Sequence, residues 1–356
     1  MHIVHVVGAR PNFMKVAPVF RALGRGHVRQ TVVHTGQHYD AAMSDVFFQE
    51  LEIPAPDVNL EVGSGSHAQQ TAQIMVRIEP ALLDRKPDLV LAYGDVNSTM
   101  AASLVCSKLG IRVGHVEAGL RSHDRGMPEE INRLVTDQLS DLLFTPSADA
   151  DENLLKEGIE AARIRLVGNV MIDTLVRFLP RTEVPMREIT GRYALVTLHR
   201  PSNVDDLSWL RRMLETLSTL SAELTAVFPV HPRTRERILS LGLERSNGHL
   251  CLVEPKPYVA FLGLQRHAAV VITDSGGIQE ETTFLGVPCL TVRENTERPI
   301  TITRGTNLLV GRDIDRLQRE VRRILDGHLK MSQPVPLWDG HAAERIAQSI
   351  LGSGTT

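Results

Sequence analysis

Apolar runs of strand length alternate with helix-like segments along nearly the whole chain, and this alternation constrains the fold more than any other feature. Runs such as LVLAYG (89–94) and VGHVEA (113–118) are apolar at almost every position, which is typical of strands buried on both faces of a parallel sheet. In the first half we predict strands near 2–8, 28–35, 88–94, 113–118, 142–146 and 164–168. Helical periodicity separates them at 11–25, 39–51, 68–86, 97–109 and 128–140.

The second half of the chain repeats the same rhythm. Its apolar runs are YALVTLH, LTAVFPVH, LCLVE, AVVITDS, CLTVR and NLLVG, again with helices between them. A chain of 356 residues exceeds the usual size of one core, so the repeated alternation predicts an α/β protein with two doubly wound, Rossmann-like domains. We place the joint around 169–192, where a helix gives way to a segment rich in proline and charge, and a last helix at 342–351.

Charge and cysteine usage exclude several classes of protein. The net charge is −3 with no long Lys/Arg run, which argues against nucleic acid or an anionic membrane as partner. The three cysteines are far apart and form no Cys/His cluster, so we expect neither a disulfide framework nor a zinc site, and the chain suits a reducing cytoplasm. Because the chain starts with the strand-like MHIVHVVGA, we expect no signal peptide, and no apolar run approaches the roughly 20 residues of a membrane span.

The first predicted strand ends in GARPNFMK (8–15), which carries two cations at a helix start. Gly8 permits a tight turn, and Arg10 and Lys15 can approach an anion there. The stretch is neither a Walker A loop nor a GxGxxG motif, and GSGSHAQQ (63–70) lacks the third glycine. A plain turn with solvated cations is the alternative for Gly8 to Lys15.

Three carboxylates follow separate strands of the first half. Asp95 comes directly after one strand, Glu117 ends the next, and Glu129 opens a helix together with Glu130 and Arg133. Singly, Asp95 could cap the following helix, and Glu129 and Arg133 could form an i,i+4 pair. A carboxylate at the end of an apolar strand is costly unless it is paired, and parallel strands bring their carboxyl ends to one edge of the sheet. The sequence therefore predicts a cluster of acids at this edge.

Two successive strands of the second half end in histidine and arginine. His199 and Arg200 follow one strand, and His231 and Arg233 follow the next. Each histidine alone is typical of a surface residue, but the repeated arrangement favours an anion pocket.

The stretch DSGGIQEE (274–281) predicts a nucleotide site. Ser275, Gly276 and Gly277 leave backbone N–H groups bare at a helix start, which is an anion site made from backbone and helix dipole. Glu281 lies further along this helix and can accept hydrogen bonds from ribose hydroxyls, while Arg298 supplies a nearby cation. Phosphate at the turn and sugar at the acid together indicate a nucleoside diphosphate.

These motifs resemble those of a known family. In order, they are GARPNFMK, TGQHYD, YGDVNST, HVEAGLRS, MPEEINR, GNVMID, HRPSN, PVHPR, DSGGIQEE and NTERP. The set is similar to that of the non-hydrolysing UDP-N-acetylglucosamine 2-epimerases, from Ile3 to about Gly311. The resemblance implies a glycosyltransferase-B-like fold, with two Rossmann-like domains facing a cleft, and interconversion of UDP-GlcNAc and UDP-ManNAc by a homodimer. It implies no cofactor and no metal ion.

The resemblance also assigns domains and roles. It implies an N-terminal domain at 1–170, on which a C-terminal helix at about 341–353 packs back, and a UDP-binding domain at 171–340. The implied catalytic residues are Asp95, Glu117, Glu129, His199, Lys15 and Arg133. The implied UDP-binding residues are Arg10, Arg200, Ser275, Gly276, Gly277, Glu281 and Arg298. Residues implicated in a second, allosteric UDP-GlcNAc site of some members correspond to Gln37, Glu130 and His231.

Several alternatives stay open at this point. Ser202 and Ile300 replace glutamates that are frequent in the family, and the loop between Glu117 and Glu129 is short, so UDP-2,3-diacetamido-glucuronate is a second candidate substrate. A glycosyltransferase, a hydrolysing epimerase and a non-catalytic nucleotide-sugar binder share parts of the pattern. The hexosamine C2 proton is not acidic, and the absence of a nicotinamide fingerprint favours elimination of UDP from C1 over transient oxidation at C3.

Overall fold

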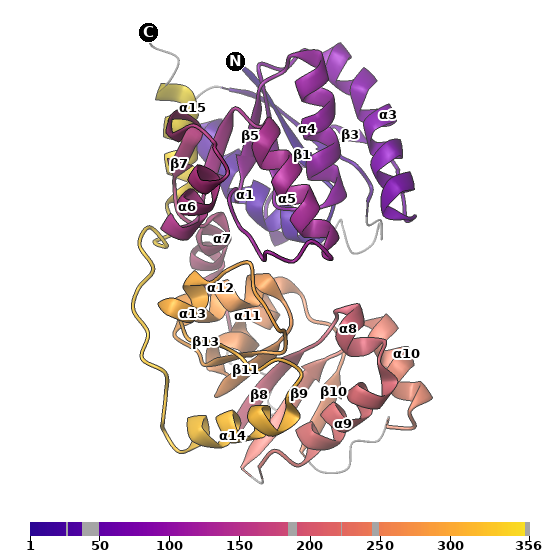
Figure 1. Cartoon of the computed structure of the whole chain (residues 1–356), viewed down its shortest axis with the longest axis vertical. Helices are drawn as coiled ribbons and strands as arrows, with labels where there is room; N and C mark the ends of the chain where they lie inside the picture. Colours follow the sequence, from indigo (N-terminus) through magenta and orange to yellow (C-terminus); the bar gives the residue numbers. More distant parts are fainter. Residues whose placement is uncertain (26–27, 38–49, 184–190, 222, 244–248, 353–356) are drawn as a thin grey trace. The chain divides into compact units, whose positions relative to one another are not determined.

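In the computed structural model, each half of the chain forms its own parallel sheet covered by helices. The structure describes residues 1–25, 28–37, 50–183, 191–221, 223–243 and 249–352. It divides into unit 1, Met1–Arg177 with Pro336–Thr356, and unit 2, Phe178–Val335. The change from one unit to the other falls at the end of the helix that begins at Val170, and the C-terminal segment returns to unit 1 (Figure 1). The helix expected at 39–51 lies mostly outside the described residues.

Unit 1 is built on a sheet in which every described strand pair is parallel. Its strands are β1 His2–Val7, β2 Arg29–His34, β3 Val58–Asn59, β4 Leu89–Tyr93, β5 Val113–Val116, β6 Leu142–Thr145 and β7 Ile164–Leu166. Over the described residues their order is β3-β2-β1-β4-β5-β6-β7. The register pairs Ile3 with Gln30 on one side and with Leu89 on the other. The short β3 was not predicted, because two residues leave no periodicity in a sequence.

Helices cover both faces of this sheet. They are α1 Arg10–Gly24, α3 His67–Arg85, α4 Asn97–Leu109, α5 Pro128–Leu139, α6 Ala148–Lys156, α7 Val170–Phe178 and α15 Ala342–Gly352, with a 3-10 turn at Ala161–Arg163. Val4, Val6 and Val90 pack with Ile78 of α3 and Ala102 of α4 in one layer of the core. Because strand side chains alternate between faces, neighbours such as Ile3 and Leu91, also fully buried, belong to the other layer. This two-sided burial is why the strands read as continuous apolar runs.

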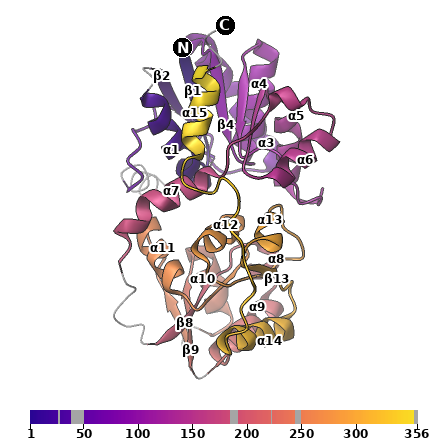
Figure 2. The ribbon, with the colours of Figure 1, turned by 90° about the vertical axis from the view of Figure 1, so that its left-hand side faces the viewer.

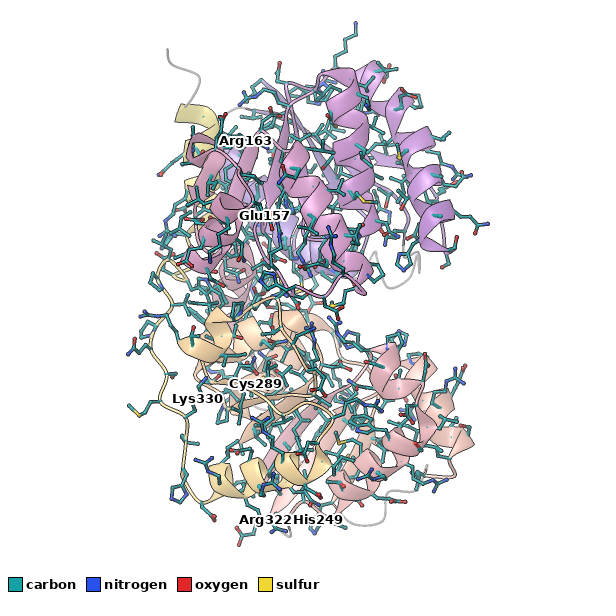
Figure 3. All side chains as sticks on the ribbon, viewed as in Figure 1. Glu157, Arg163, His249, Cys289, Arg322 and Lys330 are labelled. Atoms are coloured by element: carbon teal, nitrogen blue, oxygen red, sulfur yellow. The ribbon has the colours of Figure 1, made fainter. Side chains whose placement is uncertain are left out.

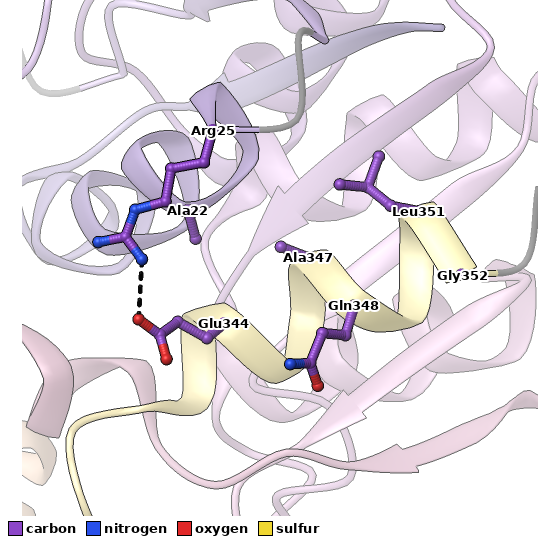
Figure 4. Close-up of a pocket in the computed structure, with 7 residues that line it drawn as sticks. All are labelled: Ala22, Arg25, Glu344, Ala347, Gln348, Leu351 and Gly352. Atoms are coloured by element: carbon purple, nitrogen blue, oxygen red, sulfur yellow. Dashed lines mark hydrogen bonds and ion pairs between the residues drawn. The ribbon is translucent and has the colours of Figure 1, made fainter.

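The C-terminal helix α15 packs on α1 although more than 300 residues separate them in sequence. Figure 2 shows α15 beside α1. Asp173 of α7 accepts hydrogen bonds from the backbone N–H groups of Ala342 (3.0 Å) and Ala343 (2.7 Å), so it caps the start of α15. Figure 4 shows the surface hollow where the two helices meet, closed at one side by the ion pair of Arg25 and Glu344. It lies at the last turn of α1, the end remote from the carboxyl edge of the sheet.

Unit 2 repeats the topology of unit 1. Its strands are β8 Arg192–Thr197, β9 Leu224–Pro229, β10 Leu250–Val253, β11 Val270–Thr273, β12 Cys289–Thr291 and β13 Asn307–Leu309. Its helices are α8 Pro201–Val204, α9 Leu207–Ser218, α10 Pro232–Ser240, α11 Tyr258–His267, α12 Gly276–Leu285, α13 Ile300–Thr303 and α14 Ile314–Leu325, with a 3-10 turn at Leu179–Arg181. Within the described ranges the strand order is β10-β9-β8-β11-β12-β13, all parallel.

The core of unit 2 also has two layers. Trp209, Leu210 and Met213 of α9 and Leu317 of α14 fill one face, while Leu264 of α11 lies in the layer on the other. Asp206 and Asp313 cap α9 and α14 through their side chains, accepting from Trp209 N and Arg316 N. The predicted α/β class with two doubly wound parallel sheets is thus confirmed.

Candidate functional site

Each sheet reverses its strand order once. In each unit, residues singled out in the sequence lie at the carboxyl ends of the strands on the two sides of that reversal. In unit 1 the order reverses between β1 and β4, and in unit 2 between β8 and β11. Connections on the two sides of such a point leave toward opposite faces, so the carboxyl ends of the central strands border a crevice that binds ligands in this class of fold. Lys15 and Asp95 follow β1 and β4, and His199 and Ser275 follow β8 and β11.

Lys15 and Glu117 form a buried ion pair in unit 1. The Lys15 Nζ lies 2.8 Å from the Glu117 Oε1, and the two side chains are only 6% and 2% exposed. Gly94 makes room for the pair, because a Cβ at this position would lie 2.7 Å from the Lys15 Nζ. Gly8 is needed for a similar reason, since a Cβ there would lie 2.1 Å from the Ser98 Oγ. Close approach to α4, rather than the tight turn expected from the sequence, thus accounts for Gly8.

The backbone of Glu117 is strained. Its φ is +76°, in the left-handed region that residues with a side chain rarely adopt. Such a conformation costs on the order of 1–3 kcal/mol and persists only when the surroundings hold it. Here the N–H groups of Glu117 and Ala118 both donate to the Phe144 carbonyl, at 3.1 and 3.0 Å. The strain is a feature of this strand end that no sequence pattern indicated.

A second charged cluster surrounds Arg133 of α5. Its Nη1 lies 2.5 Å from the Asp95 Oδ2, and its Nη2 lies 2.6 Å from the Glu130 Oε2. Glu130 also accepts from the backbone N–H groups of Ser122 and His123, both at 2.9 Å. Burial alone would raise the pKa of Glu130, but these amide hydrogen bonds and Arg133 outweigh it and lower the pKa.

The acids of the predicted cluster therefore differ in environment. The alternative that Asp95 caps α4 is wrong, because Val96 is the N-cap residue and its position receives no side-chain cap. Asp95 instead pairs with Arg133. Glu129 lies half-buried in the first turn of α5. Glu117 is fully buried.

Gln37 and Arg10 complete the unit 1 residues named from the sequence. The Gln37 Oε1 accepts from the Ser98 Oγ at 2.7 Å and from the Ser98 backbone N–H at 3.1 Å. Gln37 therefore binds the first turn of α4. Helix α1 begins at Arg10, whose side chain lies outside what the structure describes.

Asp274 organises the corresponding edge of unit 2. Its buried carboxylate accepts from the backbone N–H groups of His199 and Arg200 and from the Asn203 side chain. The His199 Nδ1 lies 2.8 Å from the Asp274 Oδ1, while 56% of the His199 side chain is exposed. Burial would raise the pKa of Asp274, but its hydrogen bonds to His199 and Asn203 outweigh this and lower it. Asp274 thus holds an exposed imidazole at the end of β8.

The glycine turn opens α12 beside Arg298. Ser275 is the N-cap residue, and Gly276 and Gly277 form the first turn, as the sequence indicated. A Cβ at Gly276 would lie 2.5 Å from the Arg298 Nη1, so only glycine lets the guanidinium approach this helix start. Arg298 also pairs with the buried Glu280, Nε to Oε1 at 2.9 Å, and with Glu297. These carboxylates fix the guanidinium in place and offset much of its charge.

Glu281 lies one turn further along α12 and is 3% exposed. The Tyr258 hydroxyl donates to its Oε1 at 2.9 Å. Burial raises the pKa of Glu281 to about 7, although the hydrogen bonds from Tyr258 and Gln265 work in the opposite direction.

His231, which was expected beside this edge, is exposed and precedes α10 as its N-cap residue.

Several residues that shape both edges were missed at the level of sequence. They are Asn12, His115, Asp137, Tyr258, Asp274, Glu280 and Glu297. Asp274 and Glu280 stand inside the DSGGIQEE motif, so their position next to the glycines was the available signal. Asp137 lies in the last turn of α5 outside any motif, and only the packing of α5 on β5 reveals its partner. Among the described residues, no group of three or more His, Cys, Asp or Glu side chains is arranged to hold a metal ion.

The fold and its two edges define the class of protein: an α/β protein with the glycosyltransferase-B-like pair of Rossmann-like domains. The family model for UDP-N-acetylglucosamine 2-epimerase matches residues 21–351. A UDP-N-acetylglucosamine 2-epimerase of Methanococcus maripaludis is 41% identical over 98% of this chain and 97% of its own. The chain therefore belongs to the UDP-N-acetylglucosamine 2-epimerase family, which is a family of isomerases.

Two further relatives bear on what the family binds. The crystal structure of Methanocaldococcus jannaschii UDP-GlcNAc 2-epimerase, in complex with UDP-GlcNAc and UDP, is 41% identical with a TM-score of 0.91 and covers 99% of this chain and 100% of its own. A UDP-2,3-diacetamido-2,3-dideoxy-D-glucuronate 2-epimerase of Pseudomonas aeruginosa is 41% identical over 98% of this chain and 99% of its own. The expected family and isomerase class are confirmed. Among the described residues, no helix is long and apolar enough to cross a membrane.

Proposed function

We propose that this protein is a non-hydrolysing 2-epimerase that interconverts UDP-GlcNAc and UDP-ManNAc without a cofactor. The observation that carries the proposal is the buried Lys15–Glu117 pair next to Asp95 and Arg133, at the switch point of a chain 41% identical to a protein crystallised with UDP-GlcNAc and UDP. Unit 1 supplies the acid and base groups, and unit 2 binds the nucleotide.

Inversion at C2 requires an activation step, because this carbon is not next to a carbonyl group. In the proposed reaction a base removes the C2 proton while the C1–O bond breaks, and UDP leaves with the bond's electron pair. The product is a 2-acetamidoglucal with a C1–C2 double bond. UDP then adds back to C1 while an acid delivers a proton to the opposite face of C2. Atoms and charge balance over the two steps.

The residues of unit 1 suit the two proton transfers. Asp95, Glu117 and Glu129 are the proposed acid and base groups, and general acid–base catalysis of this kind contributes roughly 10²–10⁴-fold to a rate. Lys15 places an ammonium donor 2.8 Å from the Glu117 acceptor, so a proton donor and a proton acceptor lie side by side. Arg133 orients Asp95 through a 2.5 Å contact.

The residues of unit 2 suit a departing diphosphate. The Ser275 N–H donates to the Thr273 Oγ1 at 3.0 Å, so the N–H groups at Gly276 and Gly277 and the dipole of α12 are the groups that stabilise the negative charge that develops on UDP. Arg200 and Arg298 add cationic donors and His199 adds a further hydrogen-bond donor, while Arg10 of unit 1 stays a predicted UDP-binding residue. Glu281, next to the Tyr258 hydroxyl, accepts from the ribose hydroxyls.

The test follows the C2 hydrogen. Purified protein is incubated with UDP-GlcNAc in D₂O without any acceptor, and NMR records deuterium at C2 and formation of UDP-ManNAc. Both signals are expected. A glycosyltransferase would give neither, and a hydrolysing epimerase would release free ManNAc and UDP. For a non-catalytic binder, Asp95→Asn would change nothing, whereas the proposal predicts near-total loss of turnover with UDP binding retained.

One alternative substrate has a specific observation in its favour. The Pseudomonas aeruginosa relative named for UDP-2,3-diacetamido-glucuronate is as identical to this chain, 41%, as the Methanococcus maripaludis relative named for UDP-GlcNAc. A panel that compares the kcat/KM of the two sugars decides between them. A clear preference for the uronic acid would replace UDP-GlcNAc as the substrate and leave the reaction type unchanged.

Assembly, location and regulation belong to the proposal as well. We propose that the protein is a homodimer in the cytoplasm. Light scattering of the purified chain measures its oligomeric state. The second UDP-GlcNAc site implied for Gln37, Glu130 and His231 stays a prediction. Because Glu130 holds Arg133, its substitution would act on catalysis through Arg133 and Asp95 as well as on any second site. Gln37 and His231 are therefore the better residues for a test of allostery.

A further inference from the structure

A buried charged network lies beneath the two catalytic strand ends of unit 1. His115 of β5 and Asp137 of α5 are both fully buried, and the His115 Nδ1 lies 2.6 Å from the Asp137 Oδ1. The Arg121 Nη2 lies 2.7 Å from the other oxygen of Asp137. Arg121 in turn forms a two-pronged pair with Glu157, Nε to Oε1 at 2.8 Å and Nη2 to Oε2 at 2.7 Å. Glu157, labelled in Figure 3, is the more exposed end of the network.

Two hydrogen bonds, one at each ring nitrogen, fix the orientation of the His115 ring. Its Nε2 lies 2.8 Å from the backbone oxygen of Gly94, and a carbonyl oxygen can only accept, so Nε2 carries a hydrogen. Its Nδ1 faces the Asp137 Oδ1, while the other oxygen of this carboxylate accepts from Arg121 and from the Gly119 N–H. His115 and Asp137 are both 0% exposed, so water does not compete for these hydrogen bonds.

The network forms hydrogen bonds with the backbone just before Asp95 and just after Glu117, the two proposed catalytic acids. The bond from His115 to Gly94 holds the residue before Asp95. The bond from the Gly119 N–H to the Asp137 Oδ2, 3.1 Å, holds the residue two positions after Glu117. Glu117 itself has its left-handed backbone between these points, at a φ of +76°. One buried group of side chains thus connects the loops that carry Asp95 and Glu117.

We infer that His115, together with Asp137 and Arg121, positions Asp95 and Glu117 for proton transfer at C2, an inference that rests on the proposed function. These are positioning residues, since they act through the backbone at Gly94 and Gly119. Their loss displaces the carboxylates, and a misplacement of about 1 Å costs on the order of 100-fold in rate.

Two substitutions of His115 separate its two bonds. In His115→Gln the amide nitrogen can take the place of Nε2 and donate to Gly94, but the bond to Asp137 is lost. In His115→Asn the amide nitrogen can take the place of Nδ1 and donate to Asp137, but the bond to Gly94 is lost. For both variants we expect kcat to fall by about 100-fold, with the KM and the affinity for UDP unchanged because unit 2 binds the nucleotide.

His2 provides a matched control. It is also buried in β1 of the same sheet, with Nδ1 bound to the Arg85 oxygen at 3.1 Å and Nε2 bound to the Thr31 Oγ1 at 3.0 Å. It lies at the amino end of the strand, opposite the catalytic edge. His2→Gln therefore removes a buried imidazole without touching the network, and its kcat should equal that of the unchanged protein.

The outcomes separate this inference from the proposed function. If the unchanged protein epimerises its UDP-sugar and both folded His115 variants keep its kcat, the inference is wrong and the function stands. Should neither variant fold, Glu157→Gln at the exposed end replaces them, with a smaller loss of kcat expected and an unchanged kcat counting against the network. Crystal structures of the variants give a readout that does not depend on activity. If the crystal structures of the variants keep the Glu117 φ near +76° and leave Asp95 and Glu117 undisplaced, the inference is wrong. This outcome does not depend on which sugar is the substrate.

Discussion

At the scale of single residues, the site consists of charges that are held by other charges. Lys15 holds Glu117, Arg133 holds Asp95, and Asp274 holds His199. The Lys15–Glu117 pair is buried on both sides, so breaking it leaves a buried charge without compensation, which costs about 3–5 kcal/mol. A rigid arrangement suits a reaction in which a proton must reach one face of a carbon and not the other.

Glu117→Gln should slow proton transfer at C2 by roughly 10²–10⁴-fold while UDP binding is retained. The amide keeps the shape of the side chain but can neither take nor return the C2 proton. Leakage of the glucal would identify Glu117 as the acid that returns the proton, and absence of the glucal would identify it as the base. The measurement is NMR of C2 deuteration and glucal release, with calorimetry for UDP binding.

The same change leaves the Lys15 ammonium without its carboxylate, so we also expect the free energy of unfolding of unit 1 to fall by about 3 kcal/mol. The double variant Lys15→Met with Glu117→Gln is the control that restores stability without restoring catalysis. Loss of UDP binding in the single variant would instead indicate a structural role for Glu117.

Glu281 should make UDP binding depend on pH. Its pKa is raised to about 7, and only the ionised carboxylate accepts both ribose hydroxyls. The affinity for UDP should therefore fall as the pH drops through about 7, approaching tenfold per pH unit below it. Glu281→Ala should weaken binding by about 1.5–3 kcal/mol at pH 8.

Calorimetry of UDP binding between pH 6 and pH 8 measures this dependence, with Glu281→Gln as the control. The β-phosphate of UDP titrates in the same range, with a pKa near 6, and its contribution appears equally in both proteins. An affinity for UDP that is the same in Glu281→Ala and the unchanged protein would mean that this residue does not contact the ribose.

At the scale of elements, the site depends on the residues that come directly after the central strands of each sheet. The switch points between β1 and β4 and between β8 and β11 exist because connections leave toward opposite faces of each sheet. Helix α12 starts at such a point with two glycines, and this start accommodates Arg298. Helix α15, in contrast, is held by a side chain of α7, so its position is set by contacts distant in sequence.

Asp173 should make the anchoring of α15 weaker as the pH rises. Burial raises the pKa of Asp173 to about 6 in the folded chain, against about 3.9 when unfolded. Since the folded state binds the proton more tightly, the penalty is absent below about pH 4, grows between pH 4 and 6, and is fully present above pH 6. It amounts to about 2–3 kcal/mol.

Hydrogen exchange of the α15 amides, compared at each pH with Asp173→Asn, measures this effect. Asparagine does not titrate, so the protection of the unchanged protein relative to the variant should be greatest near pH 4 and smallest near pH 7. A ratio that does not vary over this range would contradict the raised pKa.

At the scale of the whole molecule, the chain is two repeats of one topology with a C-terminal segment that belongs to the first. Each unit has its own two-layered core, so each is expected to unfold as a separate cooperative transition. The segment from Pro336 contributes the buried side chains of Ile346 and Ile350 to unit 1.

Deletion of residues 336–356 should therefore destabilise unit 1 and spare unit 2. Loss of Ile346 and Ile350 alone removes about 3–6 kcal/mol of burial, comparable to the stability of a whole domain. Scanning calorimetry should show that one transition is lost or shifted downward while the other persists. Deletion of residues 353–356 alone, which keeps α15, is the control, and equal effects of the two deletions would show that α15 does not stabilise unit 1.

Much of this protein is determined by its sequence. Apart from the two-residue β3, the strands of both sheets were predicted to within a few residues, because strands buried on both faces must be apolar throughout. The ends of these strands identified where the polar residues would gather. The anion site at Gly276 could be predicted from the sequence, because a helix that begins with two glycines leaves its backbone N–H groups accessible. The family could be recognised from the sequence because its motifs lie at those same strand ends.

Only the tertiary structure decided how the charges are paired. The sequence offered a cap for Asp95 and an i,i+4 partner for Arg133, whereas packing of α5 on β5 brings Arg133 to Asp95 and Asp137 to His115. It likewise decided that Glu117 adopts a left-handed backbone and that Asp173 caps a helix 169 residues away. Local propensity sets the strands and helices, because it acts between near neighbours. Pairing of buried charges depends on which surfaces meet after folding, and no short window of sequence contains that information.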